Sequence, residues 1–317
     1  MDSTGHVPIV DLSKLRSTLP ERSPAVQTSA GYARTRVINH GISTDILHDA
    51  LDAAAAFFDL PMGDRSGLAS DDVTMPVRYS TVSEVDNGEV RIRRQVLKQY
   101  SYPLEDWIGK WPAKPLQYRE KMAKYAAEIR RLVSELVEAI TESLGLGRGY
   151  LRAQMERGFE MMALNCYPPP SATSDGGAIC CAAHTDYTLV TVLLASREGL
   201  EEFDREAGSW RAVPHDPGSL VVHVGNYLEV VSNGRYRAAT HRVVAFGRDG
   251  GGGARVSIAS LPSLGMDERV EVAKELVDAR HPALYTGSTL REFIEFLSAG
   301  GNGSDFVERL KINNGSD

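Results

Sequence analysis

The chain of 317 residues is 42% hydrophobic and has a net charge of -7, with a sequence pI near 5.7. That length and hydrophobic content can bury a sizeable core, whereas the acidic balance argues against a nucleic-acid partner, because phosphate binding needs clustered Lys and Arg. Its three cysteines are too few for a disulfide framework, and no apolar run reaches the roughly 18 residues that cross a bilayer. We therefore expect no membrane partner and, since the amino terminus lacks a secretory pattern, a cytoplasmic protein.

The first part of the chain is predicted to mix short strands with helices. Residues 7–12 and 37–41 have strand-like composition, and the second run ends at a turn glycine. Apolar residues recur at helical spacing over residues 43–60, where a hydroxyl residue caps the start and a proline ends the run. Residues 71–89 show no regular pattern. A long amphipathic helix is predicted over residues 115–145.

From residue 158 the pattern changes to short apolar runs separated by turn residues. These runs cover residues 159–167, 188–195, 199–203, 209–213, 219–225, 241–246 and 254–260. Such spacing is typical of an antiparallel sandwich or barrel. A C-terminal helix returns at residues 290–297, so we predict a mainly β protein with α elements, in which helices wrap a β core.

Two nearby side chains in this β region could bind a metal. His184 and Asp186 are two residues apart at the mouth of a predicted strand, so period-two geometry turns both to one face. His241 opens another strand and supplies a third ligand if the two strands are neighbours. Two histidines and one carboxylate leave coordination positions open, as in non-haem iron(II) oxygenases. On its own, however, a His-x-Asp motif is more often a structural hydrogen-bonded pair.

The next run strengthens the metal hypothesis. Residues 241–246 and 254–260 are predicted to form an antiparallel hairpin, in which Arg255 and Ser257 share a strand face with His241. A guanidinium and a hydroxyl there can grip a carboxylate. A buried Arg without an acidic partner is costly, which indicates that a ligand supplies the anion.

Other candidates favour ordinary structural roles. The glycines at residues 250–253 lack the Lys-Ser/Thr ending of a phosphate loop and are interpreted as a flexible hairpin loop. His40 precedes a turn glycine and is interpreted as structural. His215 and His223 could compete as ligands, but His223 lies inside a strand, where a core role or support of a ligand is expected.

Several motifs occur together in a characteristic order, at residues 7–13, 37–41, 165–170, 184–186, 232–244 and 255–257. In this order the chain resembles the plant-type 2-oxoglutarate/Fe(II)-dependent dioxygenases, a family that also contains relatives of isopenicillin N synthase. The resemblance implies a double-stranded β-helix (jelly-roll) core flanked by helices, with an N-terminal helical region. We accordingly expect an N-terminal dioxygenase region at 1–110, a long connecting helix at 111–157, the catalytic jelly roll at 158–265 and a C-terminal helix and tail at 266–317.

The resemblance also implies the cofactors. Arg255 and Ser257 would bind the distal carboxylate of 2-oxoglutarate, whose keto-acid end chelates Fe(II). Asn165 and Tyr167 match an Asn-x-Tyr motif that lies near this co-substrate. O2 would be consumed, ascorbate would support turnover, and succinate and CO2 would be released.

Within the family, the chain most resembles flavone synthase I and flavanone hydroxylases. The expected substrate is therefore a small aromatic plant metabolite such as a flavanone, which the enzyme would hydroxylate or desaturate. We expect the protein to be a monomer. The substrate pocket is expected at Tyr187, Leu261, Phe293 and Phe296. Leu261 stands where flavonoid-oxidising members often carry an aromatic residue. Two alternatives remain open: an Fe(II) oxidase of the isopenicillin N synthase type that needs no 2-oxoglutarate, and a non-catalytic metal-binding or hormone-binding jelly roll.

Overall fold

The computed structural model describes residues 9–16, 34–86, 89–169, 178–245, 253–301 and 303–312. The strands are β1 Ile9–Asp11, β2 Arg34–Ile38, β3 Val77–Asp86, β4 Glu89–Tyr102, β5 Phe159–Tyr167, β6 Ile179–His184, β7 Val190–Ala195, β8 Leu200–Asp204, β9 Ser209–Ala212, β10 Leu220–Val224, β11 His241–Val244 and β12 Arg255–Ser263. The helices are α1 Leu12–Leu15, α3 Thr44–Phe58, α4 Met62–Ser66, α5 Leu104–Trp107, α6 Tyr118–Ser143, α7 Arg152–Glu156, α8 Asn226–Val231, α9 Leu290–Ser298 and α10 Gly303–Leu310, with short 3-10 turns at Ile108–Lys110 and Lys274–Leu276.

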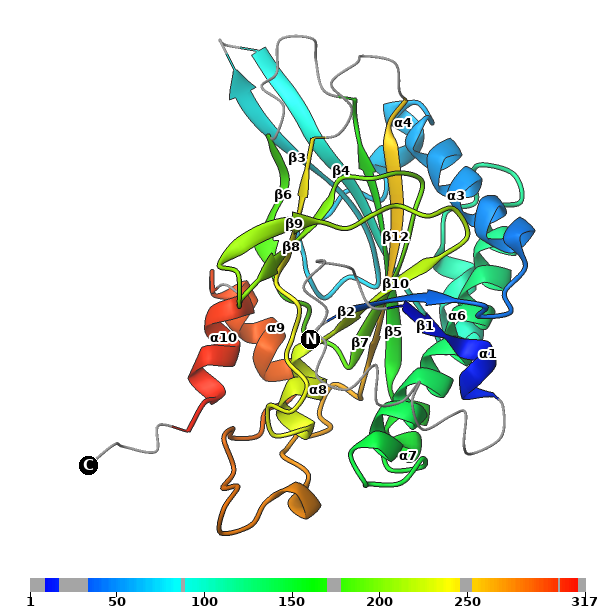
Figure 1. Cartoon of the computed structure of the whole chain (residues 1–317). Coiled ribbons are helices and arrows are strands. Elements are labelled where there is room, and N and C mark those ends of the chain that lie inside the picture. Colours follow the sequence, from blue (N-terminus) through cyan, green and yellow to red (C-terminus); the bar gives the residue numbers. More distant parts are fainter. Residues whose placement is uncertain are drawn as a thin grey trace.

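Two sheets form the centre of the molecule (Figure 1). The larger has the order β1-β2-β10-β7-β12-β5-β4-β3, and the smaller has the order β6-β11-β8-β9. The long helices α3 and α6 pack on each other and on the large sheet (Figure 1). This is the jelly-roll core flanked by helices that the sequence predicts.

The main hydrophobic core lies between the large sheet and the helices. Ser43 caps α3 by accepting a hydrogen bond from the Asp45 amide, as predicted. On α6 a continuous stripe of apolar side chains is buried, and the helix stops just before Gly145, which takes a left-handed φ of 79°. A much smaller apolar cluster lies near the four-stranded sheet. The space between the sheets is therefore only partly filled, and a cavity remains there.

The predicted hairpin of residues 241–246 and 254–260 is wrong. β11 pairs with β6 and β8, whereas β12 lies between β5 and β7 in the other sheet. The chain crosses from one sheet to the other between these strands, because each sheet needs the other to cover its inner face. Of the predicted glycine loop at 250–253, residues 250–252 lie outside the described residues.

Two further strands differ from the prediction. Residues 71–89, predicted to be irregular, contain β3, whose pairing with β4 compensates for its polar composition. β6 was not predicted and ends at His184, while the strand predicted after the motif, at residues 188–195, is present as β7. In the described part of the chain no helix is long and apolar enough to cross a membrane.

A buried carboxylate lies on β5, outside the cavity between the sheets. Glu160 is 1% exposed, and neither of its carboxylate oxygens accepts a hydrogen bond in the described structure. The nearest cation is Arg130, whose Nη1 is 4.0 Å from Oε2 of Glu160. Burial raises the pKa of Glu160 to about 7, against the smaller opposing effect of Arg130.

This shift predicts how stability depends on pH. Between the unfolded pKa near 4.5 and the folded pKa near 7, the folded protein keeps a proton that the unfolded chain releases, so stability falls as pH rises through this window. Glu160→Gln removes this titration. The free energy of unfolding of the variant, relative to that of the wild type, should therefore rise by about 3 kcal/mol from pH 4.5 to pH 8. Urea unfolding at both pH values measures it. A difference in unfolding free energy that does not change with pH would contradict the raised pKa of Glu160.

Candidate active site

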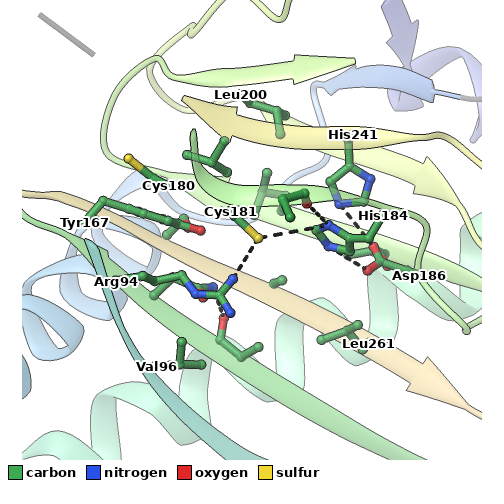
Figure 2. Close-up of a pocket in the computed structure, with 18 of the residues that line it drawn as sticks. Arg94, Val96, Tyr167, Cys180, Cys181, His184, Asp186, Leu200, His241 and Leu261 are labelled. Atoms are coloured by element: carbon green, nitrogen blue, oxygen red, sulfur yellow. Dashed lines mark hydrogen bonds and ion pairs between the residues drawn. The ribbon is translucent and has the colours of Figure 1, made fainter. Parts of the chain in front are cut away.

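Three side chains converge at one end of the cavity between the sheets. His184 ends β6 and His241 begins β11, and the two residues are direct partners in the antiparallel ladder. Asp186 follows two residues after His184, and its carboxylate, which is 11% exposed, lies beside the two rings (Figure 2). Nε2 of His184 is 3.8 Å from Oδ1 of Asp186, and Nε2 of His241 is 3.8 Å from Oδ2. Ligand atoms of all three residues lie within 4.8 Å of one another.

Backbone contacts fix the orientation of both imidazoles. Nδ1 of His184 is 2.8 Å from the carbonyl of Ala182, and Nδ1 of His241 is 3.0 Å from the carbonyl of Ala239. A carbonyl only accepts, so Nδ1 of each ring carries a proton, and Nε2, which faces the Asp186 carboxylate, is the nitrogen left to bind a metal. Two ring nitrogens and a carboxylate, with no fourth ligand among the residues that the structure describes, fit an open metal site and not a closed structural one.

The protonation of the three groups follows from their surroundings. Burial opposes ionisation of Asp186, but the two imidazoles more than offset it and hold its pKa below the usual value. Burial lowers the pKa of His241 to about 4, which leaves this ring neutral and ready to bind a metal. For His184, burial is outweighed by the Cys181 thiol and by Asp186, which raise its pKa to about 9.

The other predicted site residues line the same cavity, whose volume is about 490 Å³. Arg255 is 1% exposed, and its guanidinium donates to Ser257 Oγ and to the Arg197 carbonyl, each at 3.2 Å. No described carboxylate forms an ion pair with it. Tyr167 lies beside it, with the ring centre 5.3 Å from Cζ of Arg255. Arg255 pairs with Tyr167 and Ser257 with Asn165 across β12 and β5, so all four face the cavity together.

The competing histidines lie outside the metal-ligand cluster. His40 accepts a hydrogen bond from the Ile42 amide and contacts the Gly218 carbonyl. His215 contacts the Ala195 carbonyl. His223 lines the cavity, but its Nε2 is 2.8 Å from Glu202 and its ring lies 4.5 Å from that of His241. It therefore packs against a candidate ligand without joining the triad.

Comparison with known proteins identifies the family. The chain is 42% identical to "2-oxoglutarate-dependent dioxygenase 21, chloroplastic" of Oryza sativa subsp. japonica over 96% of this chain and 91% of that protein. It is 40% identical to "Flavanone 3-dioxygenase 3" of the same organism over 96% and 93%. Residues 158–261 match the 2OG-Fe(II) oxygenase superfamily, and residues 7–120 match the non-haem dioxygenase N-terminal region.

The chain is a plant-type 2-oxoglutarate/Fe(II)-dependent dioxygenase. Solved structures agree on the fold. The rice dioxygenase for auxin oxidation has a TM-score of 0.79 at 24% identity, covering 97% of this chain and 100% of that one. JOX2 in complex with 2OG, Fe and JA has a TM-score of 0.82 at 23% identity, covering 96% and 89%. Membership also identifies the cofactors of this dioxygenase as Fe(II) and 2-oxoglutarate.

A second cavity of about 230 Å³ adjoins the first and shares Asp186, Lys98 and Leu261 with it. Three of the four predicted pocket residues, Tyr187, Leu261 and Phe293, line it, and Tyr187 stacks on Phe293 with ring centres 4.0 Å apart. The prediction for Phe296 is wrong. Phe296 is not a lining residue but packs on Phe306, because it lies on another side of α9.

Sequence reasoning missed the cations that β3 and β4 bring to this dioxygenase site. Arg94 points into the first cavity and donates to Cys181 Sγ at 2.7 Å (Figure 2). Lys98 lines both cavities and Arg78 lines the second. The alternation of residues 94, 96 and 98 along one strand was the available signal, but the sequence does not say which strand face meets another sheet.

Gly225, which follows β10, lies in close contact with the loop that carries Asp186 and Thr188. A Cβ at this residue would lie 2.2 Å from the carbonyl oxygen of Thr188, and the next amide, of Asn226, donates to the Asp186 carbonyl at 2.9 Å. Gly225→Ala should therefore cost about 1–3 kcal/mol of unfolding free energy and weaken iron binding by displacing Asp186. Urea unfolding and iron titration measure the two effects.

Gly67→Ala is the matched control, since it has φ of -64° and no atom within 4 Å of an added Cβ. Equal stability and iron affinity in the two variants would show that the close approach at Gly225 is unimportant.

Proposed function

We propose that this dioxygenase binds Fe(II) through His184, Asp186 and His241, anchors 2-oxoglutarate on Arg255 and Ser257 with Asn165 and Tyr167 beside it, and hydroxylates or desaturates a small aromatic metabolite. The observation that carries the proposal is the shared cavity: a triad with the Nε2 atoms of both histidines turned to one carboxylate faces a buried guanidinium that has no described acidic partner. A buried guanidinium of this kind is stabilised when a ligand supplies the anion.

Each residue has a distinct task in this scheme. When bound, Fe(II) with 2-oxoglutarate supplies the oxidative chemistry, so no side chain need act as a general base. The triad positions the metal, and the Ala182 and Ala239 carbonyls keep its imidazoles in the ligating tautomer. Arg255 and Ser257 fix the far end of the co-substrate, since a planar fork and a hydroxyl can together hold one carboxylate.

A flavanone is the first substrate to test. Two relatives bear the name flavanone 3-dioxygenase, at 40% and 34% identity. The second cavity offers an apolar wall of Leu261 and the stacked pair of Tyr187 and Phe293. O2 consumption, support by ascorbate, a monomeric state, a cytoplasmic location and the absence of nucleic-acid partners complete the proposal.

Succinate release tests it. Protein loaded anaerobically with Fe(II) is mixed with oxygen, ascorbate, labelled 2-oxoglutarate and naringenin, and labelled CO2, succinate and oxidised naringenin are measured. Coupled succinate and product support the full proposal. If succinate is released with other aromatic metabolites but naringenin is not oxidised, the flavanone is excluded as the substrate. Substrate oxidation without labelled CO2 would favour an oxidase of the isopenicillin N synthase type, and metal binding without any turnover would favour a non-catalytic binding protein.

A further inference from the structure

Two cations face each other at the substrate side of the site. Arg78 on β3 and Lys98 on β4 are direct partners in an antiparallel ladder, so their side chains leave the same face of the sheet. Both line the second cavity. Like charges directly opposite each other destabilise a sheet, so the repulsion between Arg78 and Lys98 should lower the stability of the protein.

Neither cation has a directly paired carboxylate in the described part of the chain, although Asp72 attracts Arg78 and Asp186 attracts Lys98 from farther away. Within the described ranges neither forms an ion pair, and the hydrogen bond of Arg78 goes to the Met75 carbonyl at 2.7 Å. Asp186 is the one carboxylate among the described residues that line either cavity. Burial lowers the pKa of Lys98 to about 8, and the nearby charges of Arg78 and Arg94 add to the effect. The lysine therefore remains mostly protonated at neutral pH although its surroundings disfavour the charge.

The expected cofactors do not supply the missing anion. Fe(II), Asp186, Arg94 and Arg255 together carry three positive charges, of which the two carboxylates of 2-oxoglutarate balance two. Lys98 and Arg78 add two more, so the lining of the two cavities keeps positive charge for a further anionic ligand.

The sheet register separates this pair from the Arg255 anchor. On β5, Tyr167 lies opposite Arg255, while Ala163 lies opposite both Lys98 and Ala259. Four residues of strand, or about 13 Å of backbone, divide the two positions. The small Ala163 and Ala259 leave room above the sheet beside Lys98, and the next row holds Met161, Leu261 and Tyr100, which continue into the apolar wall.

We propose that Lys98 and Arg78 bind a carboxylate of the substrate, and that this dioxygenase oxidises a small carboxylic acid whose body is aromatic or otherwise apolar. The inference rests on the proposed oxygenase function and narrows its substrate class: an acidic aromatic compound should be preferred to a neutral flavanone. The carboxylate lies against the two cations, and the apolar body lies along Leu261 and Phe293 beside Asp186, which brings its C–H bonds to the metal side of the cavity.

Matched acids and amides test the charge directly. Protein loaded anaerobically with Fe(II) and 2-oxoglutarate is titrated calorimetrically with 1-naphthylacetate, cinnamate and indole-3-acetate, with the three corresponding amides, and with naringenin. At least one acid should bind tenfold or more tightly than its amide and than naringenin. Equal affinity within every pair, tighter binding of the amides or of naringenin, or no binding by any acid would overturn the inference.

Variants then locate the binding group. Lys98→Met should remove most of the preference for the acid, Lys98→Arg should retain it, and Lys124→Met, a change at an exposed lysine of α6, should leave it intact. Because Lys98→Met also removes a like-charge contact, its Tm without ligand should be equal to or higher than that of the wild type. A preference that survives Lys98→Met, or a marked fall of Tm in that variant, would assign Lys98 a structural role instead.

The failure of this inference can be told from the failure of the proposed function. Binding of 2-oxoglutarate to the Fe(II) protein is measured first, without any panel compound. If 2-oxoglutarate does not bind, the proposed function is wrong. If it binds but neutral compounds are preferred, only the assignment of an acidic substrate falls.

Discussion

Asp186→Ala should abolish turnover, with no succinate released above the background of metal-free protein. Asp186 is the one carboxylate among the three candidate ligands, and it lies 3.8 Å from the Nε2 atom of each histidine. Without it two neutral imidazoles remain, and iron affinity should fall by about 100-fold or more, since even residues that only support a ligand contribute 10- to 100-fold. Iron stoichiometry after desalting and succinate release measure the two losses.

Thermal unfolding gives an independent readout of the same change. A metal that binds the folded state raises Tm, so Fe(II) added anaerobically should raise the Tm of the wild type but not of Asp186→Ala. Asp267→Ala removes an exposed carboxylate that pairs with Arg291 at the surface, and it should keep the full iron response. Normal iron content in Asp186→Ala would show that the metal is held elsewhere.

The sequence predicted the local features of this site well because they depend on short-range pattern. Alternation over residues 159–167 matches β5, which places Asn165 and Tyr167 on the cavity side. The stripe on the C-terminal helix was also predicted, and Leu290, Phe293, Ile294 and Leu297 all line the second cavity. These patterns need only the period of a helix or a strand and the direction of the core.

What the sequence could not predict is which strands become neighbours. His241 and Arg255 were expected on one hairpin, yet they reach the cavity from opposite sheets. The two residues do line the same cavity, as expected, but they do so because the two sheets face each other and not because their strands are neighbours. Strand period gives the face of a residue, but it does not give the sheet to which the strand belongs.

The same limit hid the cations of the substrate side. Lys98 and Arg78 oppose each other only because β3 pairs with β4, and β3 lies in a segment whose polar composition gave no strand signal. Tertiary pairing overrides weak strand propensity. The feature that best narrows the substrate class is therefore visible only when both strands are placed.

Arg255→Lys should weaken 2-oxoglutarate binding by about 10- to 100-fold, because a charged hydrogen bond contributes about 1.5–3 kcal/mol. The Arg255 guanidinium is held in place by the Ser257 hydroxyl and the Arg197 carbonyl. A lysine keeps the positive charge but loses the planar fork that holds two carboxylate oxygens at once. Calorimetric titration of the anaerobic Fe(II) protein with 2-oxoglutarate measures the change.

Iron affinity separates this effect from general damage to the site. Arg255 lies on the opposite sheet from His184 and His241, so Arg255→Lys should bind iron as the wild type does while the KM for 2-oxoglutarate rises. Arg131→Lys, on the exposed face of α6, should change neither quantity. If Arg255→Lys left 2-oxoglutarate affinity unchanged, the anchor would have to be another cation of the first cavity, and Arg94, which lies beside Tyr167 and donates to Cys181, would be the residue to substitute next.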